Sequence, residues 1–165
     1  MAHHRIAVVP GDGIGPEVID AGVEVLESLA NREPSLTFDF QRFDWGTNYY
    51  KRTGLMMPED GRDQLRRFDA IYFGAVGAPD VPDHITLWGL RLAICQSFDQ
   101  YANVRPARLL PGISGPLRNC PPENLDWIIV RENSEGEYAG AGGRVHRGLP
   151  EEVGMDVSVF TRTGV

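Results

Sequence analysis

The stretch Arg5-Ile-Ala-Val-Val-Pro10-Gly-Asp-Gly-Ile-Gly-Pro-Glu17 decides the fold, because a strand pattern runs directly into the start of a helix. Its first half is a short apolar run bounded by Pro10 and glycine, which is typical of a buried strand. Pro16 suits the first turn of a helix, and Glu17 is favourable at the positive end of the helix dipole. The stretch therefore predicts a strand, a tight Gly-rich turn and a helix whose apolar positions continue to Leu29.

Strands and helices continue to alternate along the N-terminal part of the chain. The next predicted elements are a strand, a helix, a buried strand and a helix, over residues 36–43, 58–68, 69–77 and 86–100. This order is typical of βαβ units around a parallel sheet. Short strands and Pro- and Gly-rich loops follow, with strands expected over residues 104–110, 126–132 and 153–161. The change predicts a domain boundary between segments 1–102 and 103–165.

Composition and charge exclude several classes of partner. The chain has 165 residues, enough for a sizeable core, and a net charge of −7, which argues against nucleic acid and anionic membranes. It contains no apolar run long enough to span a bilayer. Cys95 and Cys120 are too few and too far apart for a metal site or a disulfide framework, so we expect a reducing, cytoplasmic setting.

The Gly-rich turn Gly11-Asp-Gly-Ile-Gly15 has some features of a dinucleotide-binding loop. That loop needs glycine or alanine where Pro16 stands, and proline lacks the backbone N–H that a pyrophosphate would bind. A tight strand-to-helix turn therefore fits better than an ordinary Rossmann site.

The stretch Trp127-Ile-Ile-Val-Arg131-Glu-Asn-Ser-Glu-Gly-Glu-Tyr138 contains the main candidates for chemistry. Residues 128–130 predict a buried strand, so Arg131 would emerge at the strand end, where open α/β sheets bind ligands. A guanidinium there can hold a carboxylate through two parallel hydrogen bonds, and Tyr138 can donate a proton. The alternative is that Arg131 only caps the strand through a surface ion pair.

Three motifs follow one another along the chain: Pro10-Gly-Asp-Gly-Ile-Gly-Pro-Glu17, Val104-Arg-Pro106 and Val130-Arg-Glu-Asn-Ser-Glu-Gly-Glu-Tyr138. Together they resemble the β-decarboxylating 2-hydroxyacid dehydrogenases, which include isopropylmalate, isocitrate, tartrate and D-malate dehydrogenases. The resemblance implies an isopropylmalate-dehydrogenase-like α/β fold, with a parallel or mixed sheet flanked by helices. The chain would be the N-terminal portion of a two-lobed enzyme, with residues 1–102 in the large cofactor-side lobe. Residues 103–165 would begin the small substrate and dimerisation lobe.

The resemblance also implies roles for individual residues. Arg105 and Arg131 match the arginines that hold the substrate's carboxylates. Tyr138 matches the tyrosine that protonates the enol after carbon dioxide leaves. The matched positions on the NAD side are Ile14, Ala75, Val76 and Gly77.

One position departs from the family pattern. The family usually has a third arginine ten residues before Arg105, where this chain has Cys95. Arg91 lies four residues earlier, one helical turn away on the same face, and its long side chain could reach the substrate. An arginine at this place suits a small, polar diacid. The alternative is a surface cation on the helix. Cys95 itself is interpreted as a small packing residue.

The implied function is NAD-dependent oxidative decarboxylation of a small 2-hydroxy diacid of the tartrate or D-malate type. Other stretches resemble that branch of the family: Phe43-Asp-Trp-Gly46, Met56-Met-Pro-Glu-Asp60, Asp83-His-Ile-Thr-Leu-Trp-Gly89 and Phe98-Asp-Gln-Tyr-Ala-Asn103. The family also uses Mg²⁺ or Mn²⁺, whose ligands, with a catalytic lysine, are expected outside these 165 residues. We therefore expect a homodimer at full length and no dehydrogenase activity from this chain by itself.

Other interpretations stay open. A 3-isopropylmalate dehydrogenase is one, and a non-catalytic half-enzyme that binds a complementing chain is another. For the second, residues 140–159 match the arm that relatives extend to their partner, or else form a flexible Gly-rich loop followed by a strand. The short chain could be a cleaved product, a split gene product or a natural short form. An unrelated doubly wound protein would require all three motif matches to be coincidental.

Overall fold

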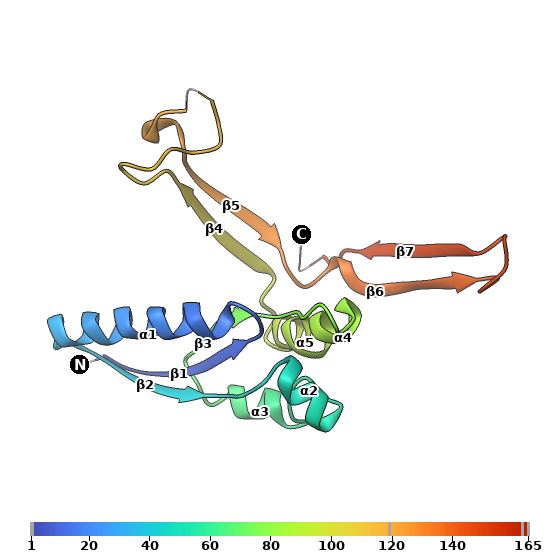
Figure 1. The fold of residues 1–165 in the computed structure, drawn as a ribbon, viewed down its shortest axis with the longest axis horizontal. Coiled ribbons are helices and arrows are strands. Elements are labelled where there is room, and N and C mark those ends of the chain that lie inside the picture. Colours follow the sequence, from blue (N-terminus) through green and yellow to red (C-terminus); the bar gives the residue numbers. More distant parts are fainter. Residues whose placement is uncertain (1, 119, 163, 165) are drawn as a thin grey trace. The chain divides into compact units, whose positions relative to one another are not determined.

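The computed structural model describes residues 2–118, 120–162 and 164 of the chain. Its elements form two compact units, Met1–Ser97 and Phe98–Val165 (Figure 1). The assignment of residues 1–102 and 103–165 to two lobes of a larger enzyme stays a prediction.

The first unit contains a parallel sheet with β1 (Ala2–Gly11) in its centre. On one side of it lies β2 (Leu36–Arg42) and on the other β3 (Ala70–Ala75), so that Ile6 is paired with both Phe40 and Ala70. The helix α1 (Gly15–Arg32) follows β1 directly, as the proline near its start predicts. The predicted α/β fold with a parallel sheet flanked by helices is confirmed.

Alternate side chains of β1 are buried on both faces of the sheet. Ile6 and Val8 pack with Ile19 of α1, and partly buried side chains surround this cluster: Val23, Phe38, Phe40 and Tyr72. Ala7 and Val9, which point to the opposite face, are also buried. A strand covered on both faces reads as a continuous apolar run, which is the pattern of residues 6–9.

The remaining helices of this unit are short. They are α2 (Thr47–Thr53), α3 (Gly61–Leu65), α4 (Asp83–Thr86), the π-helical turn η1 (Leu87–Arg91) and α5 (Leu92–Ser97). The helix predicted over residues 58–68 is therefore too long, because α3 has only five residues. Helices this short have little stability of their own, so packing of the buried Leu65 determines where α3 forms.

The second unit consists of paired antiparallel strands. β4 (Ala102–Arg108) pairs with β5 (Asp126–Glu132) across a loop that includes a 3-10 turn, η2 (Pro122–Asn124). β6 (Gly136–Val145) pairs with β7 (Val153–Val159).

The strand β6 corrects the interpretation of its Gly-rich segment as a flexible loop. At Gly142 an added Cβ would lie 2.3 Å from the carbonyl oxygen of Met155, so glycine lets the two backbones approach. Gly142 thus serves strand pairing, although glycine ordinarily weakens a strand.

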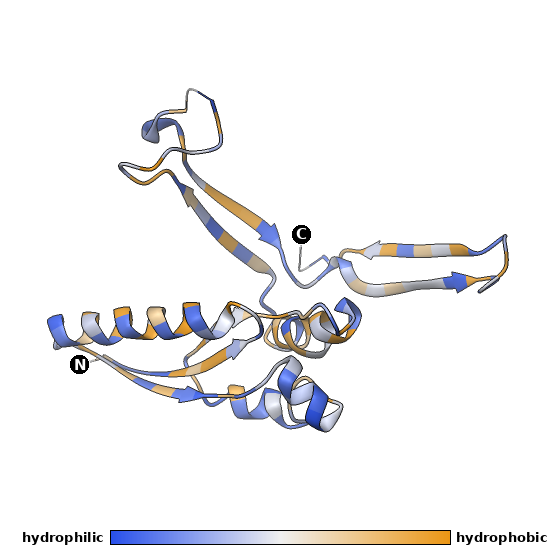
Figure 2. Cartoon of the chain, in the orientation of Figure 1, coloured by the Kyte–Doolittle hydropathy of each residue, from blue (hydrophilic) through white to orange (hydrophobic). Residues whose placement is uncertain are grey.

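The apolar run in β5 is exposed, which corrects the prediction of a buried strand. Ile128 is 71% exposed and Val130 67%, and Figure 2 shows the apolar stretch along β5. An apolar run indicates that a strand is suited to burial, but burial also needs an element that covers it. Within the described residues, β4 is the only strand that pairs with β5.

We expect Ile19→Ala to lower the free energy of unfolding by about 2–5 kcal/mol, because it leaves a cavity between α1 and β1. Val25→Ala on the same helix should change it by less than about 0.5 kcal/mol, since Val25 is 67% exposed. Urea unfolding of the 165-residue chain checks both values. Equal losses from the two variants would contradict the described packing of α1.

Candidate functional site

In the first unit, two turns meet at the carboxyl ends of neighbouring parallel strands. Residues 11–15 follow β1 and residues 75–77 follow β3, and we call these residues the β1–β3 rim. The chain runs from β1 to β2 on one side and returns to β3 on the other, so the rim lies at a topological switch point. Such points are where open α/β sheets bind ligands.

The two turns of the rim are held in close contact. The backbone N–H of Asp12 donates to the carbonyl of Ala75 at 2.7 Å. At Gly11, which has a φ of 71°, an added Cβ would lie 1.9 Å from the same carbonyl oxygen. Glycine is thus required at position 11 both by conformation and by space.

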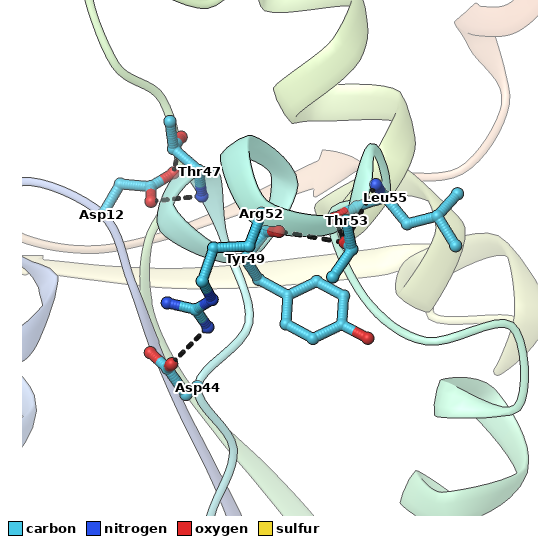
Figure 3. A network of polar contacts seen from close by, with 7 residues as sticks. All are labelled: Asp12, Asp44, Thr47, Tyr49, Arg52, Thr53 and Leu55. Carbon is cyan, nitrogen blue, oxygen red and sulfur yellow. Dashed lines mark hydrogen bonds and ion pairs between the residues drawn. The ribbon is translucent and has the colours of Figure 1, made fainter.

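The side chain of Asp12 is the centre of this arrangement, and the sequence analysis did not single it out. Its carboxylate is buried and accepts hydrogen bonds from the backbone N–H and the hydroxyl of Thr47, at 2.6 and 2.7 Å (Figure 3). It also accepts one from the N–H of Gly77 at 3.0 Å. A short polar residue between two glycines is a weak signal for such a role, since its partners lie 35 and 65 residues away.

Asp12 also explains why α2 begins where it does. The N–H of Thr47 belongs to the first turn of α2, which has no intrahelical acceptor. The Asp12 carboxylate supplies that acceptor from another part of the chain. Farther along, Arg52 pairs with Asp44 at 2.7 Å (Figure 3), and Gly54 ends the helix with a φ of 80°.

The rim leaves open space beside Ile14, which is 61% exposed. A Cβ added at Gly13 or Gly77 would meet nothing within 4 Å. The start of α1 has few backbone donors to offer, because the N–H of Gly15 bonds to Asp12 and Pro16 has none. The rim thus exposes an apolar side chain and few backbone donors, which does not fit a pyrophosphate cradle and agrees with the interpretation of Pro16.

Arg91 lies in the same unit, at the end of the π-helical turn η1. It is half-buried between Leu90 and Leu92, which are fully buried, and Cys95 is also buried. The interpretation of Cys95 as a packing residue agrees with this burial. The substrate role of Arg91 stays a prediction.

In the second unit, Arg131 and Tyr138 are brought into direct contact. Nη2 of Arg131 donates a hydrogen bond to the Tyr138 hydroxyl, and its guanidinium carbon lies 5.4 Å from the centre of the tyrosine ring. The ion pair with Glu137 is long, at 3.8 Å, and exposed. Exposed pairs of this kind contribute little, so the contact with Tyr138 is the more specific one.

Arg105 shares a sheet face with Arg131. In the antiparallel register Asn103 is opposite Arg131, and Arg105 is opposite Ile129. Directly opposed side chains lie on one face, so Arg105 and Arg131 are diagonal neighbours on it. Nε of Arg105 donates to Asn103 at 2.9 Å, and Asn103 donates to the buried Asn133 at 3.3 Å.

The turn between β5 and β6 is shaped by the Glu132 carboxylate. It accepts hydrogen bonds from the N–H groups of Ser134 and Glu135, both at 2.7 Å. Partial burial acts to raise the pKa of the Glu132 carboxyl, but the N–H groups of residues 133–135 and the Ser134 hydroxyl together outweigh it. The pKa of Glu132 therefore lies below the usual carboxyl value.

A hollow of about 290 Å³ lies beside this turn. Its lining includes Arg131, Glu132, Tyr138 and Phe160. Glu135 joins the turn to Thr161, the second residue after β7, by accepting its backbone N–H at 2.8 Å. In the first unit, the turn that contains Ile14 lies against the turn at residues 75–77. In the second unit, Arg131 contacts Tyr138 and shares a sheet face with Arg105.

The described residues contain neither a metal-binding cluster nor a membrane-spanning helix. Residues 2–118, 120–162 and 164 contain no group of three or more His, Cys, Asp or Glu side chains that could hold a metal ion. In the same residues, no helix has the length and apolar character needed to cross a membrane.

Comparison with known proteins identifies the family. Residues 5–165 match the family described as isocitrate/isopropylmalate dehydrogenase. The chain belongs to this family. The predicted relationship is thus confirmed, and the stretches that resemble the tartrate and D-malate branch are consistent with the curated relatives.

Relatives from that branch share high identity with the chain. It is 68% identical to a probable tartrate dehydrogenase/decarboxylase of Agrobacterium vitis, covering 100% of this chain and 46% of the relative. It is 53% identical to a decarboxylating D-malate dehydrogenase of Escherichia coli strain K12, with the same coverage. The chain thus spans about half the length of the curated relatives it matches.

Solved structures show the same fold. An isocitrate dehydrogenase of Methylococcus capsulatus is similar with a TM-score of 0.74 and 29% identity, over 98% of this chain and 44% of that one. A β-decarboxylating dehydrogenase of Thermococcus kodakarensis is similar with a TM-score of 0.57 and 36% identity, over 98% and 42%.

We expect the β5–β6 turn to loosen in acid. Because the pKa of Glu132 is lowered by folding, its contribution is complete above about pH 4.3 and is lost as the pH falls through the lower, folded-state value. NMR titration should show the amide signals of Ser134 and Glu135 moving together with the Glu132 carboxyl signal.

Glu132→Ala should remove this acid transition, whereas Glu137→Gln, at an exposed carboxylate on the same hairpin, should leave it in place. A transition that persists in Glu132→Ala would contradict the assignment.

Proposed function

We propose that this chain supplies the cofactor rim and part of the substrate site of an NAD-dependent dehydrogenase. Its reaction would be the oxidative decarboxylation of a small 2-hydroxy diacid of the tartrate or D-malate type. The direct contact of Arg131 with Tyr138, on the sheet face shared with Arg105, is the observation that carries the proposal. The names of the relatives at 68% and 53% identity support the class of substrate.

Arg105 and Arg131 hold the carboxylates of the substrate in this proposal. Both are always charged, and each guanidinium can form two parallel hydrogen bonds to one carboxylate. Diagonal neighbours on a sheet lie roughly 7–8 Å apart at their Cα atoms, and long side chains can close that distance onto one small molecule. Asn103 orients Arg105 by accepting from its Nε, which leaves the terminal nitrogens for the ligand.

Tyr138 delivers the proton. After the hydride has left C2 and carbon dioxide has left the β-keto acid, the remaining enol needs a proton on carbon. The Tyr138 oxygen accepts from Arg131, so the phenol keeps its own O–H as a donor. The same guanidinium then lies beside the oxygen that becomes negative on proton transfer, and favours that step.

The β1–β3 rim would hold the nicotinamide cofactor. NAD, when bound, accepts the hydride from C2 of the substrate. Ile14 offers apolar surface to a flat ring, and Ala75, Val76 and Gly77 form the opposite turn. This fits a site that does not depend on the start of α1 for phosphate binding.

The residues of this chain do not fit the Mg²⁺ or Mn²⁺ that the family resemblance implies. Such ions need several convergent oxygen ligands, and the described residues contain no suitable cluster of acidic or histidine side chains. We propose that the ligands belong to a segment outside these residues, and we assign the dehydrogenase activity to a longer protein rather than to this chain by itself.

The choice of substrate depends on Arg91 in this proposal. A half-buried guanidinium favours a polar diacid over one with a branched apolar side chain, because an apolar group would leave the cation without hydration. This disfavours the alternative of 3-isopropylmalate. We place Arg91 with Arg105 and Arg131 among the substrate-binding residues.

A homodimer at full length and a half-enzyme with a complementing chain are both compatible with the β6–β7 hairpin. Val153, Met155 and Val157 are exposed on β7 and could pack against another chain. Co-purification from the native source distinguishes the two: a second, different polypeptide favours the half-enzyme, and one longer polypeptide favours the dehydrogenase.

We expect D-malate and tartrate to bind the chain and to shift the NMR signals of the Arg105 and Arg131 guanidinium groups. Arg131→Gln should weaken binding by about tenfold or more, the effect of losing a charge-assisted hydrogen bond. Tyr138→Phe is the matched control, because a residue that only transfers a proton contributes little to binding of the diacid.

Unchanged affinity in Arg131→Gln would contradict the proposed substrate site. Binding of 3-isopropylmalate at least as tight as that of D-malate would instead favour the isopropylmalate alternative.

A further inference from the structure

We infer that Asp12 is a positioning residue, which fixes the two turns of the β1–β3 rim in one arrangement without touching a ligand itself. Its consequence for NAD rests on the proposed function, whereas its effect on the turns does not. The carboxylate of Asp12 is buried, in a residue that is only 8% exposed. A buried carboxylate is costly unless donors surround it, so each of its partners matters.

The donors come from two separate parts of the chain. Oδ1 accepts from the N–H of Thr47, and Oδ2 accepts from both the Thr47 hydroxyl and the N–H of Gly77. Gly46, with a φ of 135°, permits this approach, because an added Cβ would lie 2.7 Å from Oδ1. The carboxylate thus joins the turn after β1, the turn after β3 and the start of α2.

The backbone of Asp12 strengthens the same connection. Its N–H donates to Ala75, and its carbonyl accepts from Gly15 at 2.8 Å. The turn at residues 75–77 is therefore bound at both ends by Asp12, at Ala75 by its backbone N–H and at Gly77 by its side chain. Ile14 lies within the turn that the Gly15 N–H closes by donating to the Asp12 carbonyl, and its side chain is exposed.

The pattern of donors requires aspartate rather than asparagine. Each carboxylate oxygen faces one backbone N–H, that of Thr47 at Oδ1 and that of Gly77 at Oδ2. An amide has one oxygen and one NH₂ group, so in either orientation its NH₂ would face a backbone N–H. Asp12→Asn therefore breaks a connection in the rim while keeping the size of the side chain.

The experiment combines two measurements on the 165-residue chain. Hydrogen exchange of the Gly77 amide, followed by NMR, measures how firmly the turn at residues 75–77 is held. Titration with NAD measures the affinity of the chain for the cofactor. Asp12→Asn should speed exchange at Gly77 and weaken NAD binding by about tenfold, as expected for one lost charge-assisted hydrogen bond. Asp39→Asn, at an exposed aspartate on β2, is the matched control and should change neither.

Thr47 provides a milder pair of variants in case Asp12→Asn does not fold. Thr47→Val removes the hydroxyl donor and keeps the shape, and it should weaken NAD binding in the same direction. Thr47→Ser retains the hydroxyl and should restore binding to the wild-type value. A purely structural role would lower the melting temperature without this difference in NAD affinity between the two variants.

The outcomes separate the inference from the proposed function. NAD binding that is equal in wild type, Asp12→Asn and Thr47→Val would overturn the inference while supporting the cofactor. Absence of NAD binding to the wild type would count against the proposed function. In that case, Gly77 exchange would still decide the inference: faster exchange in the variants supports it, and unchanged exchange overturns it.

Discussion

One buried carboxylate sets the geometry of the first unit. Asp12 binds Thr47 and Gly77, and the contacts in turn fix the carboxyl ends of β1 and β3 and the start of α2. A carboxylate taken out of water must be fully provided with donors, so the loops that supply them have little freedom to move. The turn that carries the exposed Ile14 is therefore held by hydrogen bonds to a buried charge.

The second unit relies on hydrogen-bond register instead of burial. The β4–β5 pairing puts Arg105 and Arg131 on one face, and the turn closed by Glu132 brings Tyr138 back to Arg131. Both the strand pairing and the turn use backbone donors, so they do not need a large core. This explains how a well-defined arrangement of functional groups can exist on strands whose apolar residues are exposed.

The sequence predicted features whose determinants are close together along the chain. The turn from β1 into α1 follows from Pro16 and its glycines, and the parallel sheet follows from the alternation of strands and helices. Arg131 and Tyr138 were paired because only seven residues separate them. The start of α2 and the role of Asp12 could not be predicted, since Thr47 and Gly77 lie 35 and 65 residues from Asp12 along the chain. The burial of residues 128–130 was predicted wrongly because periodicity says nothing of what covers a strand.

The register of β4 against β5 also limits how this part of the chain can change. Side chains alternate between faces, so a shift of one residue would move Arg131 to the face opposite Arg105. A shift of two residues would return Arg131 to the face of Arg105 but move it along the strand direction by two residues relative to Arg105. Inserting or deleting a single residue within these strands would therefore reverse the face of every later side chain unless a bulge absorbs it. Natural variation in length should be confined to the loop between residues 109 and 125.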